Sequence, residues 1–493
     1  MTKKTNRCAA SARGACCSGG MSRRSFLGAV TTSSVLLAGT TGAKEAGETR
    51  FIKPCGPASR YKPKVAACFV RRKEPYGMWW PGQIFDGEAV RKKCIEQTRA
   101  AAGRLGLDLQ LRETPLHSAA EFDAWLAETT AAKPDGLFVV LLDRQRHAWP
   151  SAAKAVASGV PTVIFTPVGT CFTTNTARLA EKPGCMICAT DDFRQAEFGL
   201  KALAAAAKLR QTRCLVIRGR RRFDAEMADL GVKLRYVPAR TFIDAYKATP
   251  VDERVRAMAA ELVRGARRRW KVSDQDVING IKSYMVAAKL LEQEECDAIT
   301  MDCLGALGST QISLPCIAWS KMNDEGVPAA CEADLGAVAS HIIVQYLFDR
   351  PGFQQDPVPE TVENGIIGAH CTCATRLAGF HTPPEPYNLT PHHGMRDATR
   401  RVLWREGQRV TAIDVLPGKK GAVPTKILLA TGEVVRNIAV PPAGGCVVSV
   451  LYRIDGLREP LTWPGFHQVF FYGDFRREMK QFCRLAKVEV EEV

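Results

Sequence analysis

The sequence lacks several local motifs that would assign a cofactor or a partner directly. No strand-to-helix turn carries a glycine-rich phosphate loop, and Arg218-Gly219-Arg220 lacks the later glycine of a dinucleotide-binding fingerprint. The chain also contains no recognisable nucleic-acid-binding module. These absences leave a nicotinamide cofactor unsupported and argue against a nucleic-acid partner.

The cysteines do not form a dense disulfide framework, although there are 18 of them. They are scattered through a long chain whose apolar content, 46%, is ample for substantial cores. The pairs Cys185/Cys188 and Cys371/Cys373 lie too far apart in sequence for the usual four-ligand zinc site. We therefore predict that most cysteines are buried small hydrophobic residues.

The formal net charge is +17, from 68 basic and 51 acidic residues. Basic residues cluster at 71–73, 91–93, 218–222 and 267–269. Solvated helix faces and turns are the favoured explanation. The functional alternative is an electrostatic field that attracts anionic sugars, such as sulfated or phosphorylated ones.

The amino-terminal region contains a twin-arginine pattern, MSRRSFL, at residues 21–27. A run of small and apolar residues follows it, too short for a comfortable membrane span. We therefore interpret residues 1–43 as a twin-arginine signal segment, with export to the periplasm or another extracytoplasmic space and no stable membrane insertion. Translation can start at Met1 or at Met21.

Strands and helices alternate over the next 300 residues. Short apolar runs at 64–70, 136–142 and 161–165 are separated by helical patterns such as 87–105 and 119–131. Runs of this kind, buried on both faces, are typical of parallel sheets covered by helices. The pattern predicts two open, doubly wound α/β domains, one over 60–170 and one over 171–350.

The chain changes character at about residue 351. Prolines cluster there, and short β-like runs at 409–415, 426–430, 434–440 and 446–451 follow, separated by Pro-Gly, Lys-Gly and Thr-Gly turns. This pattern predicts a small antiparallel, barrel-like β domain over 351–493, which ends with a helix at 476–485.

Two carboxylates and a distant imidazole are the strongest candidates for a site. Glu332 and Asp356 lie 24 residues apart, and His467 follows far downstream. Each alone is better explained as a helix cap or a core residue. Together they are ligands that a divalent cation such as Mn²⁺ accepts, with positions left for a substrate's oxygens.

These segments resemble the L-fucose isomerase / L-arabinose isomerase superfamily. The resemblance is carried by five segments, in order Cys331-Glu332-Ala333-Asp334, Asp356, His370-Cys371, His467 and Gly473-Asp474. It implies two α/β domains and a β-rich domain with the site at their junction. It also implies a metal-dependent aldose–ketose isomerase that acts on a fucose- or arabinose-like monosaccharide through an enediol, and a homo-oligomer, either trimer or hexamer.

The resemblance also implies roles for individual residues. Glu332 and Asp356 are expected to bind the metal and to act as the acid/base pair, with His467 as the third ligand. His370 is a possible additional ligand, and Asp334 is expected to support the ligands.

One strand departs from the family pattern, because Met301-Asp302-Cys303-Leu304 stands where relatives often have Cys-Trp-Pro. Fold alone does not fix function. Two alternatives therefore stay open: a metal-dependent epimerase or lyase on a sugar derivative, and an extracytoplasmic sugar-binding protein without turnover.

Overall fold

The computed structural model describes most of the chain after residue 51. The described residues are 52–53, 55–73, 77–79, 84–144, 147–392, 396–419, 423–439 and 446–493. Within the chain, Arg50–Val493 form one compact unit. The twin-arginine segment predicted over residues 1–43 lies outside the described residues.

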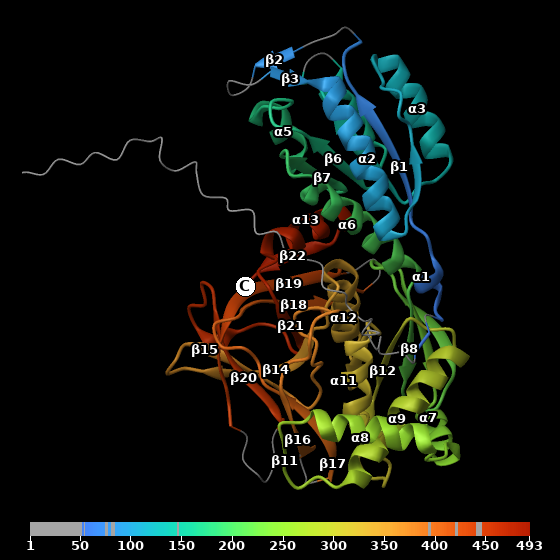
Figure 1. Ribbon diagram of the computed structural model, residues 1–493, viewed down its shortest axis with the longest axis vertical. Coiled ribbons are helices and arrows are strands. Elements are labelled where there is room, and N and C mark those ends of the chain that lie inside the picture. Colours follow the sequence, from blue (N-terminus) through green and yellow to red (C-terminus); the bar gives the residue numbers. More distant parts are fainter. Residues whose placement is uncertain are drawn as a thin grey trace, which may run out of the picture. The chain divides into compact units, whose positions relative to one another are not determined.

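Five parallel strands form the first sheet, in the order β4-β1-β5-β6-β7. Figure 1 labels three of them, β1, β6 and β7. They are β1 (Lys64–Val70), β4 (Asp108–Leu111), β5 (Gly136–Leu141), β6 (Thr162–Thr166) and β7 (Cys185–Ala189). Every residue of β5 is buried, as expected for a central strand with helices on both faces. The accompanying helices are α2 (Gly87–Leu105), α3 (Ala119–Ala131), α4 (Ala148–Ala157), α5 (Thr173–Ala180) and α6 (Phe193–Gln211). The open, doubly wound α/β fold predicted for this region is confirmed.

The bounds of α2 follow from its capping residues. The Asp86 side chain accepts hydrogen bonds from the backbone N–H groups of Glu88 and Ala89 at the start of the helix. Gly106 ends the helix with a φ of 64°, a left-handed conformation that glycine adopts at little cost. Short elements precede α2: α1 (Pro57–Arg60) and an antiparallel pair of strands, β2 (Gly77–Trp79) and β3 (Ile84–Asp86).

The first sheet runs past residue 170, where the sequence predicted the second domain to begin. β7 contains the Cys185-Met186-Ile187-Cys188 segment and pairs in parallel with β6. Its cysteines are buried strand residues, and their small apolar side chains account for the strand that the sequence interpretation missed. The predicted divisions at 170 and 350 stay predictions, since Arg50–Val493 form a single compact unit.

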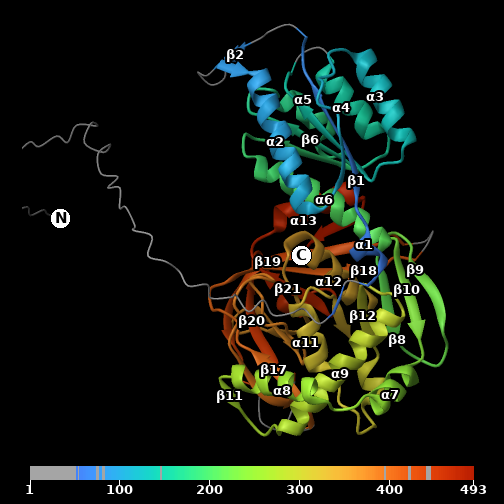
Figure 2. The same cartoon turned by 45° about the vertical axis from the view of Figure 1, so that its right-hand side comes forward.

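The second sheet has the order β13-β12-β8-β10-β9 (Figure 2). Its strands are β8 (Arg213–Ile217), β9 (Phe223–Met227), β10 (Val232–Val237), β12 (Ala298–Met301) and β13 (Ala329–Cys331). All its pairings are parallel except that of the edge strand β9. The helices of this region are α7 (Ala239–Ala248), α8 (Glu253–Gly265), α9 (Asp274–Gln293), α10 (Cys303–Leu307), α11 (Cys316–Asp324) and α12 (Leu335–Phe348).

The carboxyl-terminal region contains a closed antiparallel barrel. Its strands pair in the order β18-β21-β14-β15-β20-β19, and β19 pairs again with β18. They are β14 (Phe353–Glu360), β15 (Gly365–His370), β18 (Arg409–Leu416), β19 (Lys426–Asn437), β20 (Val448–Ile454) and β21 (Gln468–Tyr472). Closure removes the exposed sheet edges, and the barrel-like prediction is confirmed.

Smaller elements complete this region. The strand β22 (Glu489–Glu492) pairs in parallel with β19. A separate small sheet has the order β11-β16-β17. Its strands are β11 (Arg268–Arg269), β16 (Tyr387–His392) and β17 (Arg396–Val402). The turn η1 (Pro460–Thr462) and the helix α13 (Arg476–Ala486) lie on either side of β21 in the sequence.

One predicted turn is wrong. Thr431-Gly432 was expected to separate two strands, but both residues lie inside the continuous strand β19. Gly432 pairs with Val410 on one side and with Ile454 on the other. A Cβ atom at Gly432 would lie 2.3 Å from the Arg453 carbonyl oxygen. The glycine is therefore required by a close approach of two barrel strands and not by a turn.

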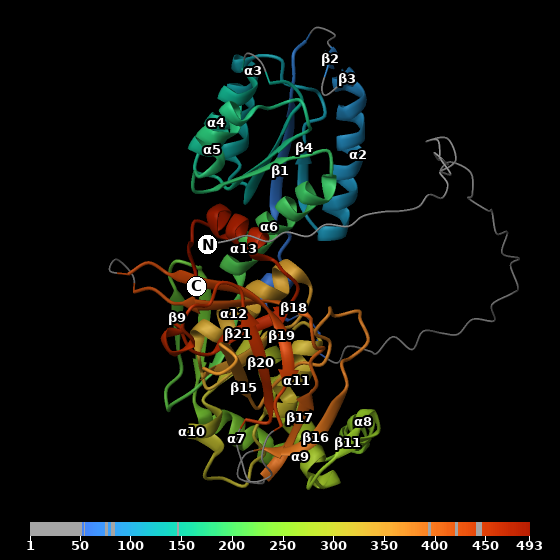
Figure 3. The same ribbon diagram turned by 90° about the vertical axis from the view of Figure 1, so that its left-hand side faces the viewer.

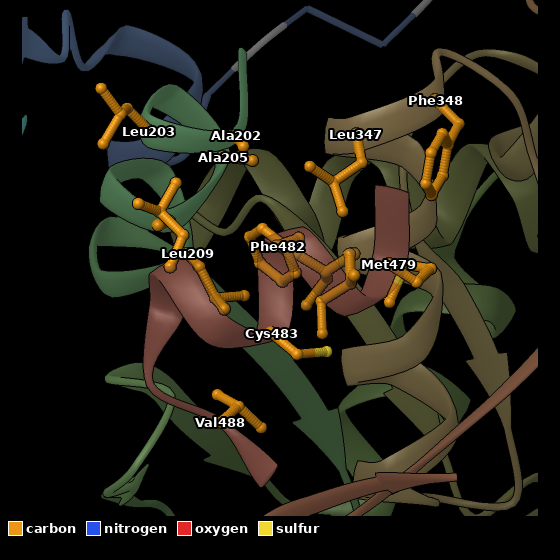
Figure 4. Packing of buried hydrophobic residues seen from close by; sticks show 14 of the residues in the cluster. Ala202, Leu203, Ala205, Leu209, Leu347, Phe348, Met479, Phe482, Cys483 and Val488 are labelled. Carbon is orange, nitrogen blue, oxygen red and sulfur yellow. The ribbon is translucent and has the colours of Figure 1, made fainter. Parts of the chain in front are cut away.

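The sheets and the barrel share one hydrophobic cluster, which contains Val140, Val216, Ile343 and Val469. The helix α12 packs against β18 and β21 of the barrel (Figure 3). In Figure 4, Phe482 of α13 lies among side chains from α6 and α12. The barrel is thus joined to the α/β region by buried apolar contacts, which fix the barrel strands relative to the second sheet.

No helix within the described ranges is long and apolar enough to cross a membrane. The export signal and the trimeric or hexameric assembly stay predictions.

Candidate metal centre

Glu332 lies at the carboxyl edge of the second sheet, directly after β13. The chain leaves β10 at one side of β8 and continues in β12 on the other side, so the strand order reverses between β8 and β12. Ligands of open α/β sheets bind outside the carboxyl ends of strands at such a switch point. Glu332 and Ala333 have φ angles of 63° and 53°. This left-handed backbone conformation is unfavourable for residues other than glycine and is often found at functional sites.

Three adjacent barrel strands bring the other candidates together. Asp356 lies on β14 opposite Ala369 of β15, and His370 is the last residue of β15. On the other side of β14, Gln355 pairs with Gln468, the first residue of β21. His467 precedes Gln468 and therefore lies next to Asp356. Asp356 is thus part of a strand, whereas the sequence interpretation placed it only after the end of a helix.

The side chains converge around His467. Its Nε2 atom lies 3.1 Å from Asp356 Oδ1 and 3.5 Å from Glu332 Oε2. His370 Nε2 lies 3.8 Å from the other carboxylate oxygen of Glu332, Oε1. Glu332, His370 and His467 each offer a ligand atom, and these three atoms lie within 4.8 Å of one another. Asp356 is outside that group of three but contacts His467.

Asp334 links the centre to α12. Its Oδ1 atom accepts a hydrogen bond from the Ala337 backbone N–H at 2.7 Å, so Asp334, and not Glu332, is the N-cap of the helix. Its Oδ2 atom lies 3.0 Å from His467 Nδ1. A hydrogen bond from Nδ1 to a carboxylate fixes the orientation of the imidazole and directs Nε2 toward Glu332 and Asp356. The resemblance implied a supporting role for Asp334, and that role stays a prediction.

The pKa values reflect this concentration of acidic groups. Burial alone would lower the pKa of His467, but the contacts with Asp334 and Asp356 raise it to about 10. Burial raises the pKa of the Glu332 carboxyl, and the charges of Asp356 and Asp334 add to this effect against the opposing charge of His467. For Asp356 the effect of burial is outweighed by His467 and His370, which lower its pKa. Of Glu332, Asp334 and Asp356, only Glu332 therefore has a raised pKa.

The donor atoms fit a divalent cation. Asp356 Oδ1 and His467 Nε2 are buried and only 3.1 Å apart, yet neither atom has a hydrogen bond of good geometry. A cation between them would satisfy both atoms. Carboxylate oxygens and imidazole nitrogens are suitable ligands for Mn²⁺, Fe²⁺, Co²⁺ and Zn²⁺. Of the described residues, only Glu332, His370 and His467 form a group of three or more side chains able to hold a metal ion.

The sequence interpretation missed two residues next to the centre. The Cys446 thiol lies 3.9 Å from Asp356 Oδ2 and is hydrogen-bonded to Cys371. Asp414 accepts a hydrogen bond from the Phe466 backbone N–H, and burial raises the pKa of Asp414 to about 6. Neither Cys446 nor Asp414 had a local signal in the sequence. Both reach the centre through strand pairing and loop contacts between distant parts of the chain.

Other sequence candidates lie elsewhere. Asp474 pairs with Arg409 at 2.9 Å on an exposed part of the barrel. His392 is a buried residue at the end of β16, and His393 lies outside the described residues. Cys185 and Cys188 are buried, and burial raises the pKa of each thiol to about 12. These two cysteines therefore have neither the exposure nor the thiolate character that a redox pair requires.

No protein-family model matches the chain. Over 216 residues it is 27% identical to a sulfoquinovose isomerase from Clostridium sp. (strain MSTE9). The match covers 40% of this chain and 45% of the relative, so the chain spans less than half the length of the curated relative that it matches. That relative is a sugar isomerase by name, and this distant similarity supports the class of enzyme that the resemblance predicted.

Proposed function

We propose that this protein is a metal-dependent aldose–ketose isomerase that acts on a monosaccharide. The observation that carries the proposal is the convergence of Glu332, Asp356 and His467 at the carboxyl edge of an open α/β sheet, with His467 Nε2 3.1 Å from Asp356 and 3.5 Å from Glu332. The similarity to a sulfoquinovose isomerase supports the same class of reaction.

Glu332, Asp356 and His467 would hold the cation, with His370 as a further ligand. Mn²⁺ is the proposed ion, because two carboxylates and an imidazole form a hard-to-borderline ligand set. When bound, such a cation would act as a Lewis acid toward the oxygens of the sugar. Asp334 keeps the imidazole of His467 oriented, through the 3.0 Å contact with Nδ1.

The two carboxylates would move the protons. Aldose–ketose isomerisation removes a proton from one carbon and returns a proton to its neighbour, so one group on each side of the carbon pair is sufficient. Glu332 is exposed on the surface of the centre and its pKa is raised, which suits the group that accepts and returns a proton. Asp356 is half-buried and its pKa is lowered, so it stays ionised and serves as the complementary base.

The test is product analysis with the full chain loaded with Mn²⁺. Wild type, Glu332→Gln and Asp356→Asn are compared on L-fucose, L-arabinose and sulfoquinovose, with ketose formation as the readout. Asp474→Asn is the matched control, because Asp474 is a barrel carboxylate paired with Arg409 away from the centre. We expect ketose from wild type and the control, and a loss of at least about 100-fold in both site variants, a typical contribution of one acid/base group.

Two outcomes would contradict the proposal. Bound metal without ketose, but with an epimer or an elimination product, would assign an epimerase or lyase. Sugar binding without any product and without metal dependence would assign a binding protein.

A further inference from the structure

Arg218 and Glu332 each directly follow the last residue of a strand of the second sheet, β8 and β13. Cys331, Met301 and Ile217 are aligned across β13, β12 and β8 by the register of the two parallel pairings. The next residues along these strands are Glu332, Asp302 and Arg218. The strand ladder continues into this row, because the Asp302 N–H donates to the Ile217 carbonyl.

The register fixes how far apart these residues are. Neighbouring strands lie about 4.8 Å apart, so the backbone of Arg218 is roughly 10 Å from that of Glu332. The last two residues of β8, Val216 and Ile217, point to opposite faces of the sheet. Val216 packs in the hydrophobic cluster that also contains residues of α6 and α12, and Ile217 packs in a different hydrophobic cluster. Arg218 continues the alternation on the face of Val216. That face is covered by α12, whose N-cap, Asp334, binds His467.

The arginines of this turn differ in their partners. Arg222 pairs with Glu294. By contrast, Arg218, Arg220 and Arg221 are exposed, and no described residue forms an ion pair with any of them. A guanidinium without an acidic partner, at the edge of a sheet where ligands bind, is available for an anionic group of a ligand.

The distance suits a sugar of six carbons. An extended chain advances about 1.2 Å per bond, which is the backbone spacing divided over three bonds. A charged oxygen on the terminal carbon is thus roughly 8 Å from the carbonyl end of an open-chain hexose. With the carbonyl end at Glu332 and His467, this group lies within reach of an arginine side chain in the same row.

We propose that Arg218 is a specificity-determining residue of this site, and that the substrate is a sugar with a sulfonate or phosphate group on the carbon remote from its carbonyl. The inference rests on the proposed isomerase function. Arg220 and Arg221 add to the positive field at the same edge. Sulfonate and phosphate share a tetrahedral centre with several anionic oxygens, which arginine binds with paired hydrogen bonds.

The test compares sugars that differ only in the anion. Sulfoquinovose and 6-deoxyglucose share the same carbon skeleton, and glucose 6-phosphate supplies the phosphate alternative. For Mn²⁺-loaded wild type we expect kcat/KM for one of the anionic sugars to exceed that for 6-deoxyglucose. Arg218→Gln is expected to raise KM for the anionic sugar about 10- to 100-fold with little change in kcat, since a charge-assisted hydrogen bond to the bound group is lost in substrate and transition state alike.

Three controls make the result specific. Arg256→Gln removes one exposed positive charge from α8 and should leave both sugars unaffected. Arg218→Lys should restore part of the affinity, because a lysine keeps the charge but not the paired hydrogen bonds. The ratio of kcat/KM for the anionic sugar to kcat/KM for 6-deoxyglucose should fall in Arg218→Gln.

The outcomes separate this inference from the proposed function. Ketose formation from neutral sugars as efficient as from anionic ones, or an unchanged KM in Arg218→Gln, would overturn the role of Arg218 and leave the isomerase intact. Absence of ketose from every sugar, with no bound metal, would overturn both. A preference for glucose 6-phosphate over sulfoquinovose would support the role of Arg218 and assign the anion as phosphate.

Discussion

Asp334 and His467 are 133 residues apart in the sequence, and their side chains lie 3.0 Å apart. The same carboxyl group caps α12, so one residue fixes both the start of a helix and the orientation of a candidate metal ligand. The centre is thus built where the second α/β sheet meets the barrel. Glu332 comes from the sheet edge, Asp356 comes from the barrel strand β14, and His467 directly precedes the neighbouring strand β21.

Asp334→Asn separates these two roles. Asparagine is as good an N-cap as aspartate, so α12 and the fold should be retained. The loss of charge next to His467 Nδ1 should weaken Mn²⁺ binding about 10- to 100-fold, the usual effect of losing the partner of a ligating histidine. Titration calorimetry with Mn²⁺ measures the affinity, and thermal unfolding checks the fold. Equal affinities in wild type and variant would contradict the supporting role.

The stability of the metal-free protein should depend on pH through His467. Its pKa is raised from 6.5 to about 10, so its contribution is complete below pH 6.5 and is lost as the pH rises through about 10. The pKa values of Asp334 and Asp356 are lowered, so their contributions are lost as the pH falls below their usual value of 3.8. Urea unfolding in EDTA should therefore show a larger loss between pH 6 and pH 10 in wild type than in His467→Asn. Asparagine is chosen because it tolerates the φ of 54° at this position. An equal loss of unfolding free energy in the two proteins would refute the assignment of this pH dependence to His467.

Gly432→Ala should destabilise the barrel. The added methyl group would lie 2.3 Å from the Arg453 carbonyl oxygen, and two paired strands leave it no room. The expected cost is about 1–3 kcal/mol. Gly103→Ala in α2 is the matched control, because nothing lies within 4 Å of its added methyl group. That change should stabilise the protein by about 0.5–1 kcal/mol. Denaturant unfolding of both variants measures the difference, and a neutral Gly432→Ala would show that the strands separate easily.

The twin-arginine signal predicted over residues 1–43 implies that the protein is exported. Replacement of Arg23 and Arg24 by lysine should keep the protein in the cytoplasm, because the twin-arginine pair is what the export route recognises. Cell fractionation with an antibody against the folded part distinguishes the two locations. Unchanged export of the double variant would refute the signal assignment.

The sequence predicted the elements whose bounds are set locally. The α2 helix occupies residues 87–105 as predicted, because Asp86 caps its start and Gly106 ends it. By contrast, β7 and the central part of β19 were missed. These segments form strands because β7 pairs with β6, and β19 pairs with β18 and β20. A local sequence pattern does not reveal such pairings.

Some residues of the candidate metal centre could be predicted from the sequence and others could not. Glu332, Asp356 and His467 could be named because their order and spacing resemble those of a known superfamily. Cys446 and Asp414 could not, since they reach Asp356 and the loop before His467 only after the barrel has closed. The position of Arg218 near Glu332 is likewise inferred from the sheet register, which aligns Ile217 with Met301 and Cys331.

Metal binding tests the central claim most directly. The full chain is loaded with Mn²⁺, dialysed, and analysed for metal beside Glu332→Gln, His467→Asn and the control Asp474→Asn. We expect about one Mn²⁺ per chain in wild type and control, weakened binding in both site variants, and ketose only where the metal is retained. No bound metal in wild type, or equal metal in all four proteins, would contradict a metal centre formed by Glu332, Asp356 and His467.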